Sequence, residues 1–352
     1  MSQKIRIKPL IFGVLFTIAF WKVLSVITYN SHSEIKHYTY PFNYFTVNIS
    51  AHGSQKDIDA VLEDLPQWLA EFQAKYRHGG AMDSVIYHAK AYDTIPLDSL
   101  AYAMFDFALF FRELSEGKID VSIGNLLRAW KNAWQNNQSL ADSTRERLVA
   151  EMQEPFYQLD SASQSMIILR EKQHFALGAF MEGIILDEID NRLAKAQIPG
   201  WLAEVSGDFS YSGVKADGKP WVLGIKNPEQ PKNLLAKVAM DPQKISFCTS
   251  GDYEQTHSTP DGKRHHHIMD PRTGESSIGN RSVSVMQSIP GMNKNTLCTW
   301  FMLLPLDEIK AKTQEFDGKI AALVILASNE IWVSPGLEQF IEFFPNDYKL
   351  LD

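Results

Sequence analysis

The 352-residue sequence predicts an α+β fold, with one mixed domain over residues 38–352 and a separate N-terminal segment before it. Apolar residues make up 45% of the chain and charged residues 22%, which is typical of a globular protein with a sizeable core. Helix-like and strand-like patterns both occur, but without the strict alternation of a doubly wound parallel sheet. The formal charge of −8 argues against a nucleic-acid partner, since such proteins usually carry a basic face.

The first thirty residues have the pattern of a targeting or membrane segment. Three basic residues precede an apolar run over 10–20, and a second apolar run covers 23–29. A cleaved signal peptide and a buried N-terminal helix are alternatives, although no small-x-small cleavage site stands out. The basic flank favours a single-pass transmembrane anchor over 1–30 in the inner membrane, with the following domain in the periplasm.

Periodicity predicts the elements of the domain in order. In the first half we expect a strand at 45–50, helices at 57–76, 97–116, 126–134 and 182–197, a turn at 120–124, and a strand pair formed by 165–169 and 172–177. The second half is richer in strands bounded by turn residues, and these are expected at 201–205, 209–212, 221–225, 245–249, 282–285 and 321–327.

The sequence contains two cysteines, Cys248 and Cys298. Two cysteines in an exported protein could pair, but neither their spacing nor their context demands it. Both lie in apolar runs, one strand-like and one helix-like. We therefore expect two buried free thiols.

The most distinctive stretch is His-Ile-Met-Asp-Pro-Arg-Thr-Gly at 267–274, which is followed by Asn-Thr-Leu-Cys-Thr at 295–299. A polar loop punctuated by Pro and Gly leads here into an apolar strand at 283–286, and then into a helix that opens with small and hydroxyl residues. Such a layout suits a site where backbone amides and a helix N-terminus meet phosphate and a metal ion.

These segments resemble the FAD:protein FMN transferases of the ApbE family, whose signature is His-Ile-x-Asp-Pro-x-Thr-Gly, a strand, and then Ala-Asp-Ala-x-x-Thr. Further segments that are similar to the family's occur in the right order. They are Asp-Val-Ser-Ile-Gly at 120–124, Leu-Gly-Ala-Phe-Met-Glu-Gly at 177–183, Ser-Gly-Asp at 206–208, Trp-Val-Leu-Gly-Ile-Lys-Asn-Pro at 221–228 and Thr-Ser-Gly-Asp-Tyr-Glu at 249–254.

The resemblance implies an enzyme that cuts FAD at its pyrophosphate, moves FMN to a Thr or Ser hydroxyl of a target protein and releases AMP. It also implies Mg²⁺ as cofactor, FAD as substrate and, as partner, a flavin-acceptor protein of a membrane redox complex. By resemblance the site residues are His267 and Thr299 (catalytic), Asp120, Ala176, Glu182, Met269, Asp270 and Thr273 (binding FAD), and Ala179, Asn295, Cys298 and Thr299 (binding the metal).

Several departures mark the chain as a divergent member. Asn295 replaces the metal-binding Asp, which removes a negative charge and lowers the expected metal affinity. Ala176 replaces an Asp that contacts the flavin nucleotide. The stretch 42–46 lacks the family's Met-Gly-Thr, and 72–84 lacks its Ser-rich loop. An alternative is therefore that the protein is a non-catalytic relative that binds FAD or a partner protein and has lost the transfer chemistry.

Each site residue also has an ordinary structural interpretation. His267 could simply fix the turn at Asp270-Pro271, where Asp caps and Pro presets φ. Thr299 could be an N-terminal helix cap, although its i, i+4 spacing from Asn295 puts both on one helix face. The histidine run 265–267, with His257 nearby, suggests a third function, a transition-metal-binding protein. Alternating side-chain directions in a strand make that geometry difficult.

Overall fold

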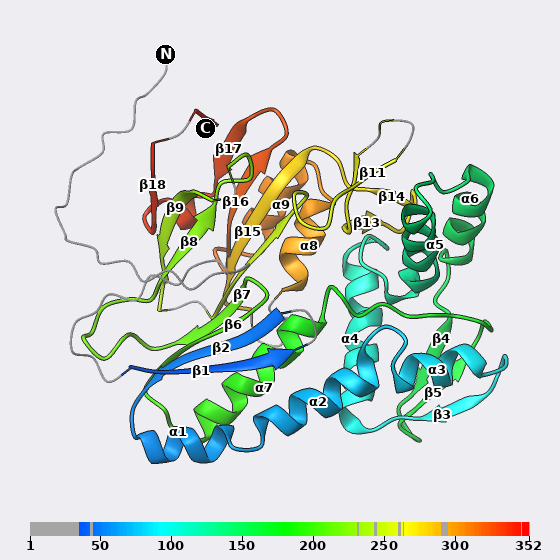
Figure 1. Ribbon diagram of the computed structural model, residues 1–352, viewed down its shortest axis with the longest axis horizontal. Helices are drawn as coiled ribbons and strands as arrows, with labels where there is room; N and C mark the ends of the chain where they lie inside the picture. The colour runs from blue at the N-terminus through cyan, green and yellow to red at the C-terminus, as the bar shows by residue number, and fades with distance from the viewer. Residues whose placement is uncertain are drawn as a thin grey trace.

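The computed structural model of the protein describes residues 35–42, 45–230, 232–242, 245–259, 262, 264–289, 295–345 and 347–351. Its architecture mixes helices and strands, as predicted, around one large sheet (Figure 1). In the residues that the structure describes, four smaller sheets of two or three strands accompany it.

The large sheet has nine strands in the described part of the chain, in the order β1-β2-β6-β7-β10-β15-β16-β17-β19. Neighbours are antiparallel except for β17 and β19, which are parallel. The strands are β1 (Ile35–Phe42), β2 (Phe45–His52), β6 (Gly200–Val205), β7 (Asp208–Ser212), β10 (Ser246–Gly251), β15 (Asn280–Gln287), β16 (Ile320–Leu326), β17 (Glu330–Val333) and β19 (Lys349–Leu350).

The central strands of this sheet are buried on both faces, which explains the nearly continuous apolar run of β16. In β16, Ala322 and Val324 belong to one hydrophobic core, whereas Leu323 and Ile325 belong to the other. The first core lies under the helices α1 (Gln55–Leu62), α2 (Leu65–Tyr76), α7 (Met181–Lys195), α8 (Thr296–Met302) and α9 (Leu306–Glu315). The second lies under a small sheet of β8 (Val222–Lys226), β9 (Leu234–Ala239) and β18 (Ile341–Phe343), with α10 (Pro335–Glu338).

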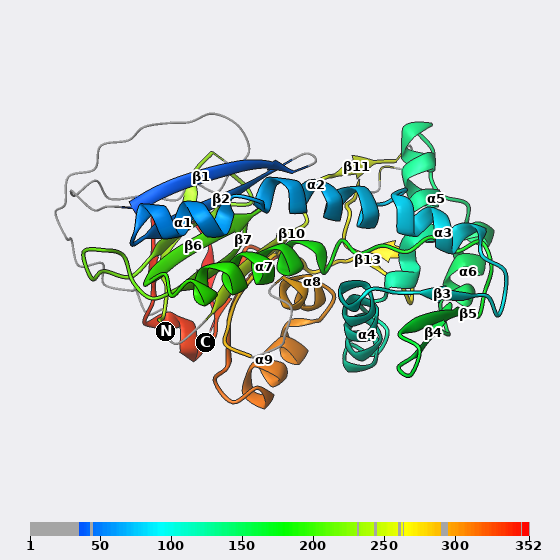
Figure 2. The ribbon, with the colours of Figure 1, turned by 90° about the horizontal axis from the view of Figure 1, so that it is seen from below.

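The remaining elements form a lobe beside the large sheet, visible at the right of Figures 1 and 2. It contains α3 (Ala81–His88), α4 (Ser99–Leu114), the 3₁₀ turn η1 (Val121–Ile123), α5 (Gly124–Gln135), α6 (Asp142–Glu151) and the sheet of β3 (Thr94–Pro96), β4 (Tyr157–Asp160) and β5 (Ser165–Ile168). Two short hairpins link this lobe to the sheet: β11 (His257–Ser258) with β12 (Arg264–His265), and β13 (Met269–Asp270) with β14 (Glu275–Ser276).

Two of the expected elements are wrong. The single helix at 57–76 is two helices, α1 and α2, because Pro66 stands in the first turn of α2 and cannot donate the backbone hydrogen bond that a continuous helix needs. The strand pair of 165–169 with 172–177 does not form. Instead β5 pairs with β3 and β4, while the N–H of Ala176 donates to the carbonyl of Val121.

The membrane anchor predicted at 1–30 lies outside the described residues. Among the residues that the structure does describe, no helix has the length and apolar character needed to cross a bilayer.

Candidate active site

The start of α8 is connected to α7 through Asn295. Asn295 is the N-cap of α8, yet its side chain does not cap that helix. Its Oδ1 accepts from the N–H of Gly183 at 3.2 Å, and its Nδ2 donates to Oε2 of Glu182 at 3.0 Å. The two segments that the sequence marks as metal-binding and FAD-binding are therefore in direct contact.

Two carboxyl groups near this contact have perturbed acidity. Glu182 is partly buried as a whole, but burial of its carboxyl group raises the pKa to about 7, while the hydrogen bond from Asn295 opposes the shift. Asp208, at the start of β7, is buried. This burial is the main reason that its pKa lies well above the usual range, and the nearby groups of Cys298 and Glu182 raise the pKa further. Perturbed carboxyl groups of this kind are common at functional sites.

A hydroxyl contacts the carbonyl of Ala179, but it is that of Thr296. Oγ1 of Thr296 donates to the Ala179 oxygen at 2.8 Å. Oγ1 of Thr299 lies 3.4 Å from Oγ of Ser250, at the end of β10. Thr299 is one turn inside α8, so it is not the helix cap. The sequence did not predict a role for Thr296, because a threonine in the first turn of a helix has no pattern that distinguishes a site residue from an ordinary helix residue.

The oxygen groups around this helix start fit a hard cation in their chemistry. Magnesium prefers carboxylate, amide and carbonyl oxygens, and these are supplied by Glu182, Asn295 and Ala179. Glu182 provides the carboxylate that Asn295 lacks. Cys298 does not fit such a set, because sulfur is a soft donor and its thiol hydrogen-bonds the Asn295 carbonyl at 2.9 Å.

The loop at 267–274 forms a turn that is held by hydrogen bonds of its own side chains. Oδ1 of Asp270 accepts from the backbone N–H of Arg272 at 2.9 Å, and Oδ2 accepts from the Arg272 guanidinium at 2.7 Å. Oγ1 of Thr273 accepts from the N–H of Glu275 at 3.2 Å. These side-chain hydrogen bonds of Asp270 and Thr273 all lie within residues 270–275 of the turn.

His267 contacts the segment that follows β10. Its Nδ1 lies 3.2 Å from the carbonyl oxygen of Glu254, which can only accept, so Nδ1 carries a proton here, and in the neutral ring Nε2 then keeps its lone pair. The residue reaches solvent, but packing of the ring among protein groups lowers its pKa and favours the neutral form. His267 and Thr299 thus both contact the segment 250–254.

The other histidines of the run have structural contacts. His265 is buried against the Trp130 ring, 4.5 Å between centroids, and Nε2 of His266 lies 2.9 Å from the carbonyl oxygen of Ser277. Within the described ranges, no group of three His, Cys, Asp or Glu donors close enough to share an ion includes a histidine. These ranges therefore provide no three-residue ligand set for the histidine-rich metal hypothesis.

The family-like segments at 120, 176 and 269 converge in the lobe. Met269 belongs to a small apolar cluster with Trp130, and Ala176 packs against the same cluster. The indole N–H of Trp130 donates to the carbonyl of Gly274 at 2.8 Å. Oδ1 of Asp120 accepts a hydrogen bond from the backbone N–H of Ser122 at 2.7 Å.

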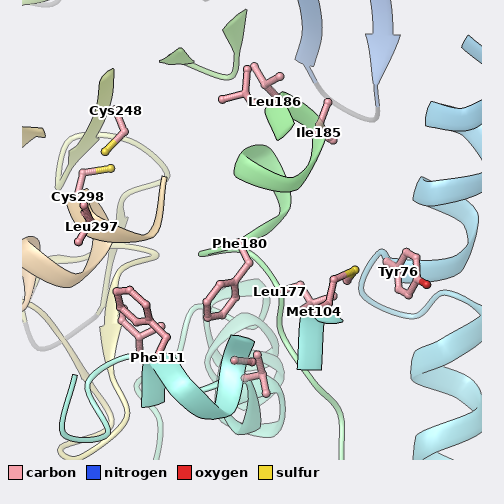
Figure 3. Close-up of a cluster of buried hydrophobic side chains, with 14 of the residues drawn as sticks. Tyr76, Met104, Phe111, Leu177, Phe180, Ile185, Leu186, Cys248, Leu297 and Cys298 are labelled. Carbon is pink, nitrogen blue, oxygen red and sulfur yellow. The ribbon is translucent and has the colours of Figure 1, made fainter. Parts of the chain in front are cut away.

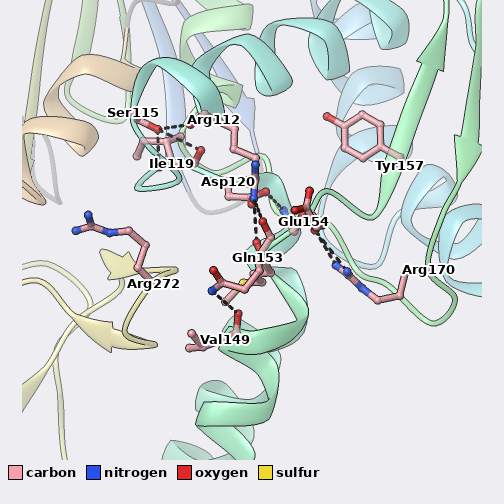
Figure 4. Close-up of polar contacts among 12 residues, drawn as sticks. Arg112, Ser115, Ile119, Asp120, Val149, Gln153, Glu154, Tyr157, Arg170 and Arg272 are labelled. Carbon is pink, nitrogen blue, oxygen red and sulfur yellow. Dashed lines mark hydrogen bonds and ion pairs between the residues drawn. The ribbon is translucent and has the colours of Figure 1, made fainter.

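Beside these segments, Arg112 holds Asp120 in an ion pair at 2.7 Å (Figure 4). Arg112 also lines a cavity of about 280 Å³ together with Pro271 and Arg272. Residues far apart in the sequence therefore meet on one side of the 267–274 loop.

The sequence pattern of the ApbE family matches residues 34–324. The chain belongs to the ApbE family. The transferases of Vibrio cholerae and Treponema pallidum, both named FAD:protein FMN transferase, are 24% and 25% identical to it. These alignments cover 66% and 69% of this chain and 67% and 70% of the relatives. A Haemophilus influenzae protein of the same name is 20% identical over 84% of each chain. The family is one of transferase enzymes.

Solved structures give the same fold. The apbE protein of Thermotoga maritima superposes with a TM-score of 0.74 at 21% identity, covering 87% of this chain and 99% of that one. The flavin transferase ApbE of Vibrio cholerae gives a TM-score of 0.73 at 20% identity, covering 88% and 99%. The ApbE-like fold that the sequence predicts is confirmed, and the low identities agree with a divergent member.

Proposed function

We propose that this protein is a FAD:protein FMN transferase. The observation that carries the proposal is the contact between α7 and α8, where Glu182 and Asn295 bring two family segments together in a chain that belongs to this family. The relatives compared above are all named for this activity.

In the proposed reaction, a Thr or Ser hydroxyl of an acceptor protein attacks the FMN phosphorus of FAD. A new P–O bond forms, the bond to the AMP phosphate breaks, AMP leaves and the hydroxyl loses its proton. Bound Mg²⁺ would neutralise charge on the pyrophosphate. The Ala179 carbonyl, Glu182, Asn295 and Thr299 would hold it, as hard oxygen donors.

His267 is the residue we assign to the proton. Its Nδ1–H donates to Glu254, and the neutral ring keeps Nε2 as an acceptor. A neutral imidazole whose other nitrogen is held in this way suits a general base for a hydroxyl.

A second candidate, a non-catalytic relative that binds FAD or a protein, is supported by two observations. Both ends of the Asn295 amide are engaged by α7, and Ala176 packs against an apolar cluster where the family has an acid. Such a protein would keep the pocket and release no AMP.

We also propose that the segment 1–30 anchors the chain in the inner membrane, with the domain in the periplasm. The acceptor would then be a protein of a membrane redox complex. The basic flank and apolar run of the sequence support this address.

The test uses the purified full chain in detergent with FAD, Mg²⁺ and a flavin-acceptor domain. Covalent flavin fluorescence on the acceptor in a denaturing gel, together with released AMP, is expected. His267→Ala should lose both, whereas His257→Ala, which changes an exposed histidine outside the site, should keep them. FAD binding without label or AMP would favour the non-catalytic candidate.

A further inference from the structure

Three side chains with metal-binding atoms meet beside the start of α8. They are Asp208 from β7, Cys248 from β10 and Cys298 from α8, and their carboxylate oxygen and two sulfurs all lie within 4.8 Å of one another. Figure 3 shows the two thiols pointing toward each other from the sheet and the helix. No pair of these residues is adjacent in the sequence, so the fold alone assembles the group.

All three residues are buried, with exposed fractions of 8% for Asp208, 0% for Cys248 and 1% for Cys298. Hydrophobic packing accounts for two buried thiols, but not for a carboxyl group turned toward them. Strand register fixes this arrangement, because Phe209 pairs with Phe247 and so sets Asp208 close to Cys248. The backbone N–H of Thr249 also donates to Oδ1 of Asp208 at 3.3 Å and holds the carboxyl group.

We propose that Asp208, Cys248 and Cys298 form a binding site for a thiophilic divalent cation of the zinc class. Two sulfurs and one carboxylate are donors that Zn²⁺ accepts, and three protein ligands leave a fourth position for water. On binding, each thiol gives up its proton and becomes a metal thiolate. Zn–S bonds of about 2.3 Å place sulfurs about 3.7 Å apart in a tetrahedron, so only a small contraction of the present group is required.

This site differs from the oxygen donors assigned to Mg²⁺. Magnesium avoids sulfur, and the zinc-class site shares neither Glu182 nor Ala179 with the oxygen set. The zinc-class cation would tie α8 to β7 and β10, and α8 begins just after Asn295 and carries Thr299. Its role is therefore structural support for the helix, separate from the proposed transfer reaction.

A disulfide is the competing use of the two cysteines. It needs sulfurs about 2 Å apart and would remove both thiols from the site. Both cysteines are free thiols in this structure. Counting free thiols in the native chain before any reductant is added separates the two possibilities, and a disulfide there would overturn the proposal.

The test uses the full chain with reduced thiols, stripped by a chelator and titrated with Co²⁺. We expect about one equivalent to bind with a thiolate-to-cobalt charge-transfer band, which Zn²⁺ removes and excess Mg²⁺ does not. Cys248→Ser and Cys298→Ser should each abolish the band, and Asp208→Asn should weaken Co²⁺ binding about ten-fold or more. His257→Asn, which changes an exposed histidine, is the matched control and should keep it.

Absence of the band in the native chain, or its survival in either cysteine variant, would overturn the proposal. Because a variant could fail to fold, the native chain provides a second measurement. Zn²⁺ should slow alkylation of both cysteines in it, and equal alkylation with and without Zn²⁺ would contradict the site. Neither measurement depends on flavin transfer, so failure of one proposal is distinguishable from failure of the other.

Discussion

Asn295 is the residue at which this chain departs most from its family, and its neighbour gives the departure a testable consequence. Asn295→Asp would place a carboxylate about 3 Å from Glu182 in place of a hydrogen-bond donor. Without a cation the two acids repel, and with one they share it. We expect Mg²⁺ to bind about ten-fold more tightly and the metal-free protein to unfold at a lower temperature, measured by calorimetry and thermal melts.

Asn295→Gln is the matched control, since it keeps an amide and adds no charge. It should give no gain in Mg²⁺ affinity. Unchanged Mg²⁺ binding in Asn295→Asp would count against the assignment of this helix start to the cation.

His266 gives a prediction for the pH dependence of stability. Burial lowers its pKa from 6.5, and its two nitrogens contact the Ser277 carbonyl and the N–H of Ile268. The second contact needs an unprotonated nitrogen. As the pH falls below 6.5, the unfolded chain takes up a proton that the folded chain resists, so stability falls with falling pH.

His266→Gln keeps a donor and an acceptor but cannot take up a proton. It should lose less free energy of unfolding than the native chain between about pH 7.5 and about pH 5.5, measured by urea denaturation. An equal loss in both proteins would show that another group carries this dependence.

The sequence could identify the members of the site but not their partners. Asn295 and Glu182 each stood in a recognisable segment, yet they lie 113 residues apart, and their hydrogen bond depends on how α7 and α8 pack. Thr296 and Asp208 acquire their contacts in the same way. Local pattern carries no record of such distances, which only the tertiary fold sets.

At the scale of elements, local chemistry predicted α4, α5, α7, the start of α8 and the central strands, and it failed where tertiary contacts decide. The stretch 172–177 looked like a strand paired with 165–169. Phe175 and Leu177 point into the core, but the backbone there bonds to η1 and not to β5. Helix α6 was missed because nine of its ten positions are not buried, so its apolar face is too narrow to give a periodic signal.

The hairpin of β13 and β14 depends on a glycine that packs against α6. Gly274 has φ +71°, and an added Cβ would lie 2.7 Å from Cγ of Arg145 and 2.9 Å from Val149. Gly274→Ala should therefore cost both backbone strain and a clash, about 2–3 kcal/mol of unfolding free energy by urea denaturation.

Gly218→Ala is the control for that measurement, since Gly218 has φ +77° and no heavy atom within 4 Å of an added Cβ. It should cost about 1 kcal/mol, the backbone term alone. Equal losses of unfolding free energy in the two variants would mean that Arg145 and Val149 of α6 move aside at no cost in stability.

At the scale of the molecule, the large sheet separates two hydrophobic cores and belongs to both. Its central strands send alternate side chains to opposite faces, so Val324 packs under the helices and Leu323 packs under the β8-β9-β18 sheet. Because the same strands contribute side chains to both cores, unfolding of these strands disrupts both cores together. This coupling predicts a single cooperative unfolding transition for the described domain.

Leu323→Ala and Val324→Ala test that coupling from the two sides. Leu323→Ala should cost about 2–5 kcal/mol and Val324→Ala somewhat less, because a smaller side chain leaves a smaller cavity. Ile278→Ala, at a side chain that is 92% exposed, should be near neutral. In each variant, tryptophan fluorescence and far-UV circular dichroism should report one shared midpoint in urea. Separate midpoints, with Leu323→Ala shifting only one of them, would mean that the two cores unfold independently despite sharing β16.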